Sequence, residues 1–107
     1  MPMEHLVKSY DQDLKRLRDM ITEMGGMVES QVALACTAVL HRDRAAATQA
    51  MEADPKVDAR EHEIEQYVIR LLALRQPVAG DLRQIVASLK ATGDIERIGD
   101  YAANVAK

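Results

Sequence analysis

Three side chains that can bind a metal through oxygen follow one another near the end of the sequence. Glu96, Asp100 and Asn104 stand four residues apart, so in a helix they lie on one face, spaced by about 6 Å along the axis. Two carboxylates at this spacing repel each other weakly, and a cation between them would turn the repulsion into attraction. Oxygen-rich faces of helical bundles commonly hold divalent or iron-type metals. The row therefore suggests a metal site.

The spacing by itself is a weak signal, because acidic pairs four residues apart recur in this chain. They also occur at Asp19/Glu23, Asp54/Asp58 and Glu61/Glu65. Arg97 could pair with Asp100, and a solvated acidic face would then explain the row without any ligand. From spacing alone the solvated face is the default interpretation.

Residue patterns for other kinds of chemistry are missing from the sequence. The three histidines, His5, His41 and His62, have no second histidine four residues away, and no Ser or Cys lies in a recognisable nucleophile motif. There is no Gly-rich phosphate-binding loop, so we expect no ATP binding. The single cysteine, Cys36, excludes an internal disulfide and a cysteine-based zinc site. We therefore expect a protein that is not an enzyme.

Length and composition indicate one soluble helical domain. The chain has 107 residues, of which 48% are hydrophobic, 29% charged and 3% aromatic. The hydrophobic fraction is too high for a disordered segment, and the few glycines and prolines leave little turn chemistry for an all-β fold. The net charge of -3 argues against a nucleic-acid surface, which is normally basic. No apolar stretch is long enough to span a bilayer and no signal peptide is visible, so we expect a cytoplasmic protein.

Hydrophobic periodicity predicts one long helix in the first part of the chain. Apolar residues spaced by three and four continue from about residue 4 to residue 41. The predicted seam consists of Tyr10, Leu14, Leu17, Ile21, Met24, Val28, Val32, Ala35 and Val39. Met20, Met24 and Met27 share this helical spacing, and we expect them to fill the core.

Capping and proline signals predict the remaining helices. Asp43 can cap a short helix over about 44–53, and Asp54 followed by Pro55 predicts a new helix over about 55–75. A turn at 76–78 with Pro77 separates it from the last helix, over about 79–107. Short connections make neighbouring helices antiparallel. The expected fold is therefore all-α, an up-down-up three-helix bundle with one additional short helix.

The last helix carries the acidic row on a face of its own. In its first half the apolar residues Leu82, Ile85, Val86 and Leu89 gather on one side, and Glu96, Asp100 and Asn104 continue that side. In the second half the apolar residues are Ile95, Ile98, Ala102 and Val105, on the opposite side. The acidic row should therefore lie at the surface or at a groove of the bundle, outside its core.

Two segments of the sequence resemble the PhoU family of phosphate-specific transport accessory proteins. One is the run Leu-Arg-Gln-Pro-Val-Ala-Gly-Asp-Leu-Arg at 74–83, and the other is Asp-Ile-Glu-Arg-Ile-Gly-Asp-Tyr-Ala-Ala-Asn at 94–104. The stretch 4–24 also resembles the first helix of the family. The resemblance extends over the whole chain.

The resemblance implies two similar three-helix bundles in tandem, each with an E(D)xxxD motif that holds a multinuclear iron or zinc cluster. Glu96 and Asp100 match that motif, and Asn104 continues it. The chain has one such bundle and stops within a predicted helix, so we expect residues 1–107 to be the first of two tandem repeats. A bundle without its neighbour would expose an apolar flank, which predicts a homodimer or higher self-association.

The function implied by the resemblance is regulatory. PhoU-like proteins act at the inner face of the membrane, where they link the phosphate ABC transporter to the sensor kinase PhoR and repress the phosphate regulon when phosphate is plentiful. The residues leave two alternatives open. One is a structural coiled-coil dimerisation module without metal. The other is a di-metal carboxylate enzyme, which is less favoured because paired Glu-x-x-His motifs are missing.

Overall fold

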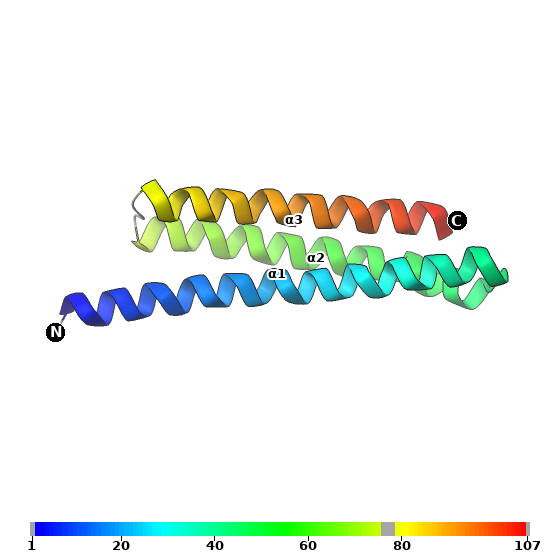
Figure 1. The fold of residues 1–107 in the computed structure, drawn as a ribbon, viewed down its shortest axis with the longest axis horizontal. Coiled ribbons are helices and arrows are strands. Elements are labelled where there is room, and N and C mark those ends of the chain that lie inside the picture. The colour runs from blue at the N-terminus through cyan, green and yellow to red at the C-terminus, as the bar shows by residue number, and fades with distance from the viewer. Residues whose placement is uncertain (1, 76–78, 107) are drawn as a thin grey trace.

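The computed structural model describes residues 2–75 and 79–106 as three long helices that lie side by side (Figure 1). They are α1 (Pro2–His41), α2 (Arg44–Arg75) and α3 (Ala79–Ala106). The direction of the chain alternates, and the bundle measures 60 × 20 × 17 Å. The predicted all-α, up-down-up bundle is confirmed, whereas the predicted turn at 76–78 lies outside the described residues. None of the described helices is long and apolar enough to cross a membrane.

Large apolar side chains from all three helices form the main core. It consists of Leu17, Met20, Met24, Val28, Val57, Ile64, Val68, Leu71 and Ile85. Burial of one such side chain stabilises the fold by about 1.5–3 kcal/mol. Met20 and Met24 are buried and Met27 packs against them, so the predicted role of the methionines is confirmed.

A second, smaller core is built mainly from alanine. Its buried members are Ala35, Ala50, Ala102 and Ala106, one or two from each helix. Alanine side chains bury little area but allow helix backbones to approach closely. The two cores divide the bundle into a half with large residues and a half with small ones.

The predicted seam of α1 is wrong at two positions. Val32 is 36% exposed and Val39 is 55% exposed, while Gln31 and Ala38 are buried instead. A search for apolar residues alone passes over Gln31, although it continues the inner face three residues after Val28. A buried polar side chain therefore occupies the centre of the seam.

The predicted division of α2 into a short helix over 44–53 and a long helix over 55–75 is also wrong. One helix continues through Pro55, although an interior proline costs about 3 kcal/mol. Ala50 and Val57, on either side of it, are fully buried against the other helices, and this packing opposes the break. The cap predicted for Asp43 is confirmed, because its Oδ1 accepts a hydrogen bond from the Ala46 N–H at 3.1 Å.

The predicted change of the apolar side halfway along α3 is wrong, because one buried face with a seven-residue repeat continues along the whole helix. The buried residues Ile85, Thr92, Gly99 and Ala106 are seven residues apart. Leu82, Val86, Ile98 and Val105, expected on apolar sides, are exposed. Small residues and Thr92 therefore pack at the inner face of α3, where larger apolar residues were expected. The Thr92 hydroxyl donates a hydrogen bond to the Ser88 carbonyl at 2.8 Å.

Candidate metal site

Four carboxylates from α2 and α3 meet where these helices run side by side. Oxygen atoms of Asp54, Asp58 and Asp100 lie within 4.8 Å of one another. The carboxyl of Glu96 lies beside those of Asp58 and Asp100 and interacts with both. We call Asp54, Asp58, Glu96 and Asp100 the acidic cluster. It combines two pairs of acidic residues, each spaced four residues apart on its own helix.

The antiparallel direction of the two helices explains which carboxylates meet. The earlier residue of the α2 pair, Asp54, lies beside the later residue of the α3 pair, Asp100. Asp58 lies correspondingly beside Glu96. Each helix keeps its two acidic side chains on one face, because residues four apart are neighbours on a helix surface.

The acidic cluster is half-open to solvent. Asp54, Glu96 and Asp100 are half-buried and Asp58 is exposed, so the cluster lies at the edge of the core. This agrees with the position expected for Glu96 and Asp100. Asn104 is exposed one turn further along α3, and its role as a ligand remains a prediction.

Sequence reasoning missed Asp54 and Asp58 as members of the site. The pair was noticed only as one of several acidic repeats that weakened the case for a metal. The pairs at Asp19/Glu23 and Glu61/Glu65 have the same spacing, so spacing alone could not select it. A stronger signal would have been an acidic pair on α2 in antiparallel register with one on α3.

Two carboxyls of the cluster, Glu96 and Asp54, and the neighbouring Glu61 have raised pKa values. The pKa of Glu96 is raised to about 8, because burial disfavours its charge and because Asp58, Asp100 and Glu61 add hydrogen bonds or negative charge. Burial also raises the pKa of Asp54, and the nearby carboxyls of Asp100 and Asp58 raise it further. The pKa of Glu61 is raised by burial and by the charges of Glu65, Asp58 and Asp100.

No basic side chain of the described part of the chain neutralises the cluster through an ion pair. Arg97, expected to be able to pair with Asp100, instead lies with its Nη1 3.7 Å from Asp94 Oδ1. Arg60 pairs with Glu23 and Glu63, outside the cluster. This contradicts the simple interpretation of a solvated acidic face neutralised by Arg97. The charge of the cluster is thus left to protons, solvent or a bound cation to reduce.

The chemistry of the donor set fits an oxygen-loving cation. The cluster offers carboxylate oxygens, which suit hard cations such as Mn²⁺ or Mg²⁺ and occur in the iron sites of helical bundles. Zinc sites usually contain His or Cys, and the acidic cluster contains neither. The cluster therefore fits a cation bound through oxygen, and its residues alone do not distinguish iron from zinc.

Helix α1 contributes one polar side chain next to the cluster. The Gln31 Nε2 donates to the Ala50 carbonyl at 3.0 Å and to Asp54 Oδ1 at 3.4 Å. This contact opposes the rise in the pKa of Asp54. Asp54 therefore does not cap a new helix, as the sequence suggested, but faces Gln31 from inside α2.

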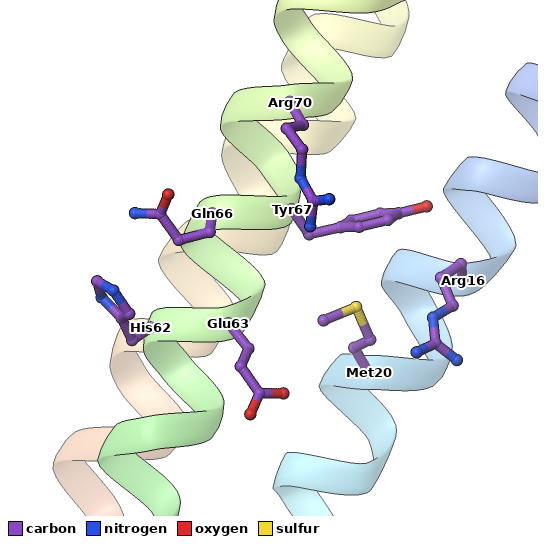
Figure 2. A pocket seen from close by; sticks show the side chains of 7 residues that line it. All are labelled: Arg16, Met20, His62, Glu63, Gln66, Tyr67 and Arg70. Carbon is purple, nitrogen blue, oxygen red and sulfur yellow. The ribbon is translucent and has the colours of Figure 1, made fainter.

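A hollow of about 410 Å³ between α1 and α2 does not form a comparable site (Figure 2). Its lining includes Arg16, Arg70 and Glu63, but His62 and Gln66 point away from α1. Tyr67 uses its hydroxyl to join the helices, since it donates to the Asp13 carbonyl at 3.0 Å. Because the polar groups do not converge, we assign no ligand to this hollow.

Comparisons with known proteins agree on one family. A family model described as PhoU domain matches residues 21–107. Three similar proteins are each called a phosphate-specific transport system accessory protein PhoU homolog. The one from Zymomonas mobilis is 43% identical over 96% of this chain and 44% of its own length. That from Caulobacter vibrioides is 46% identical over 97% and 45%, and that from Xylella fastidiosa is 50% identical over 96% and 42%. The chain thus spans less than half the length of these relatives.

The raised pKa values predict how the stability of the metal-free protein depends on pH. A carboxyl with a raised native pKa binds its proton more tightly in the folded state, so its contribution is favourable at low pH and is lost as pH rises. For Glu96 the loss falls between its ordinary pKa of 4.5 and about 8. We expect Glu96→Gln to stabilise the protein at pH 8 by about 1–2 kcal/mol, a value reduced for partial solvation.

Urea unfolding at pH 5 and pH 8 in the presence of a chelator measures this effect. The free energy of unfolding should decrease less between pH 5 and pH 8 in Glu96→Gln than in the unmodified protein. Glu29→Gln, at an exposed position of α1, is the matched control and should leave the decrease unchanged. An equal decrease in Glu96→Gln and in the unmodified protein would contradict the raised pKa of Glu96.

Proposed function

Since this chain belongs to the PhoU family, we propose that it is a regulatory adaptor of phosphate homeostasis and not an enzyme. In this role it negatively regulates phosphate uptake and phosphate-regulon signalling, through contacts with the phosphate ABC transporter and the PhoR sensor kinase. The names of its relatives support a link to phosphate-specific transport. Its place of action would be the cytoplasm, at the inner face of the membrane.

The acidic cluster is the main support for the proposal that the regulatory role depends on a bound metal. Its four carboxylates come from two helices, so a cation bound there would join α2 to α3. The ligands would be Asp54, Asp58, Glu96 and Asp100, with Asn104 as a further predicted ligand. When bound, the metal would supply positive charge that replaces protons and fixes the shape of the adaptor surface.

A second proposal concerns the apolar face between α1 and α3. Hollows of about 630 and 240 Å³ lie there and share Val32 and Ile98 in their linings. On α3, Ile98, Tyr101 and Val105 are at least half exposed. An apolar surface of this kind on a folded bundle typically contacts another protein.

Two glycines of α1 support this interpretation of the face. Gly25 and Gly26 lie inside the helix, where each costs about 1 kcal/mol relative to alanine. A Cβ at either position would meet nothing within 4 Å, so packing inside the bundle does not require them. Both line the larger hollow, where glycine would let the backbone of a neighbouring helix come close.

We infer that a second PhoU bundle covers this face. In a protein of the relatives' length, a following tandem repeat would supply it, with residues 1–107 as the first repeat. For the 107-residue chain alone, a second copy is the available occupant. The result would be a homodimer in which Ile98, Tyr101 and Val105 of each copy contact the hollow beside Gly25 of the other.

Metal binding can be tested with purified protein and a panel of Fe²⁺, Mn²⁺ and Zn²⁺ under anaerobic conditions. The unmodified chain should bind, whereas Glu96→Ala/Asp100→Ala and Asp54→Ala/Asp58→Ala should each weaken binding at least about 100-fold, because half the carboxylates are removed. Asp19→Ala/Glu23→Ala removes a pair of the same spacing and charge on α1 and should bind normally. Absence of binding by the unmodified chain would favour a metal-free dimerisation module.

The regulatory role can be tested in the cell that encodes the chain. Deletion of the gene should raise alkaline phosphatase activity in phosphate-rich medium, because repression of the phosphate regulon is lost. Restoring the gene should return the activity to its repressed level. Unchanged repression after deletion would count against the proposed regulation, whatever the result of the metal measurement.

Self-association can be measured by light scattering coupled to size-exclusion chromatography over a range of concentrations. Ile98→Lys should weaken the dimer at least about tenfold, because it places a charge in the apolar contact. Ile69→Lys is a matched control, since Ile69 is similarly exposed but lies on α2. A monomer at all concentrations, or equal effects of the two substitutions, would contradict this interface.

A further inference from the structure

A buried amide on α1 reaches both helices that form the acidic cluster. Gln31 is completely buried, at a position of the seam where its neighbours Val28 and Ala35 are apolar. Burial of a polar side chain costs free energy unless its hydrogen bonds are satisfied. An apolar residue of similar size would avoid that cost, so the amide calls for an explanation.

The amide nitrogen of Gln31 donates hydrogen bonds, whereas its amide oxygen accepts none from the described residues. Its Nε2 donates to the Ala50 carbonyl at 3.0 Å and to Asp54 Oδ1 at 3.4 Å, which are one turn apart on α2. Its Oε1 is buried and has no hydrogen-bond partner among the described residues. The side chain therefore holds the carboxylate of Asp54 against the backbone of α2 while leaving one of its own polar atoms unsatisfied.

Gly99 on α3 provides the space for this amide. A Cβ at Gly99 would lie 2.7 Å from Gln31 Oε1, so the buried amide would have to shift to make room for it. Gly99 directly precedes Asp100, a member of the cluster. The other described glycine in the middle of α3, Gly93, has open space around the same position. The two glycines thus differ in the one contact that concerns the cluster.

We propose that Gln31 is a positioning residue for the acidic cluster, and that position 99 is glycine because the Gln31 amide needs the room. This rests on the proposed metal binding. The amide orients the Asp54 carboxylate toward the oxygens of Asp58 and Asp100. The carboxylate then loses less conformational entropy when a cation binds. Residues that hydrogen-bond to metal ligands typically change metal affinity by about 10- to 100-fold when they are replaced.

The test compares metal affinity with stability in the same variants. Gln31→Met removes the donors but fills the space, so the metal-free protein should unfold at the same or a higher urea concentration, while the affinity for Mn²⁺ or Fe²⁺ falls about 10-fold or more. A residue with a purely structural role would lose stability and keep its metal affinity. Equal affinity of Gln31→Met and the unmodified protein would overturn the proposal alone. No binding by the unmodified protein would overturn it together with the proposed metal function.

The glycines supply a second, independent test. Gly99→Ala should lower the metal affinity about 10-fold, because its methyl group displaces the amide, whereas Gly93→Ala should leave the affinity unchanged. In a Gln31→Ala background, Gly99→Ala should lower the metal affinity no further, since the amide is gone and only the ordinary contact with Val28, at 3.4 Å, remains. Equal affinities of Gly99→Ala and Gly93→Ala, or additive losses in the double variant, would overturn the proposal.

Discussion

Repulsion between the four carboxylates of the acidic cluster is the constraint on which the α2–α3 half of this bundle depends. Asp54, Asp58 and Asp100 bring oxygens within 4.8 Å of one another, and each additional negative charge there disfavours the contact between α2 and α3. The raised pKa of Glu96, at about 8, is the proton-based solution. Since metal binding displaces those protons, the same repulsion that weakens the metal-free fold at high pH favours a bound cation.

The packing of the bundle allows this repulsion to be tolerated. The main core, with Leu17, Met24 and Ile64, contains the large buried side chains. The alanine core, around Ala50 and Ala102, stabilises less but lets the helices lie close together. The cluster and Gln31 lie where large residues give way to small ones. Large buried side chains such as Val28 and Val57 therefore support the site from one side, and small residues let the helices approach closely on the other.

The sequence predicted the helices better than the contacts between them. The period of three and four identified α1, and the side chain of Asp43 identified the start of α2, because both signals are local. Pro55 misled the prediction, since the burial of Ala50 and Val57 that keeps α2 continuous is a tertiary effect. Gln31, Asp54 and Asp58 were missed for a related reason: spacing gives the face of one helix, but the register between two helices decides which faces meet.

Helix α3 connects the two surfaces for which functions are proposed. Glu96 and Asp100 face α2, while Ile98, between them in the sequence, is exposed on the apolar face beside α1. A cation that fixes α3 against α2 would therefore also fix the position of Ile98, Tyr101 and Val105. Coupling of this kind is reciprocal. A partner that prefers the metal-bound arrangement must raise the affinity for the metal by the same factor by which the metal raises the affinity for the partner.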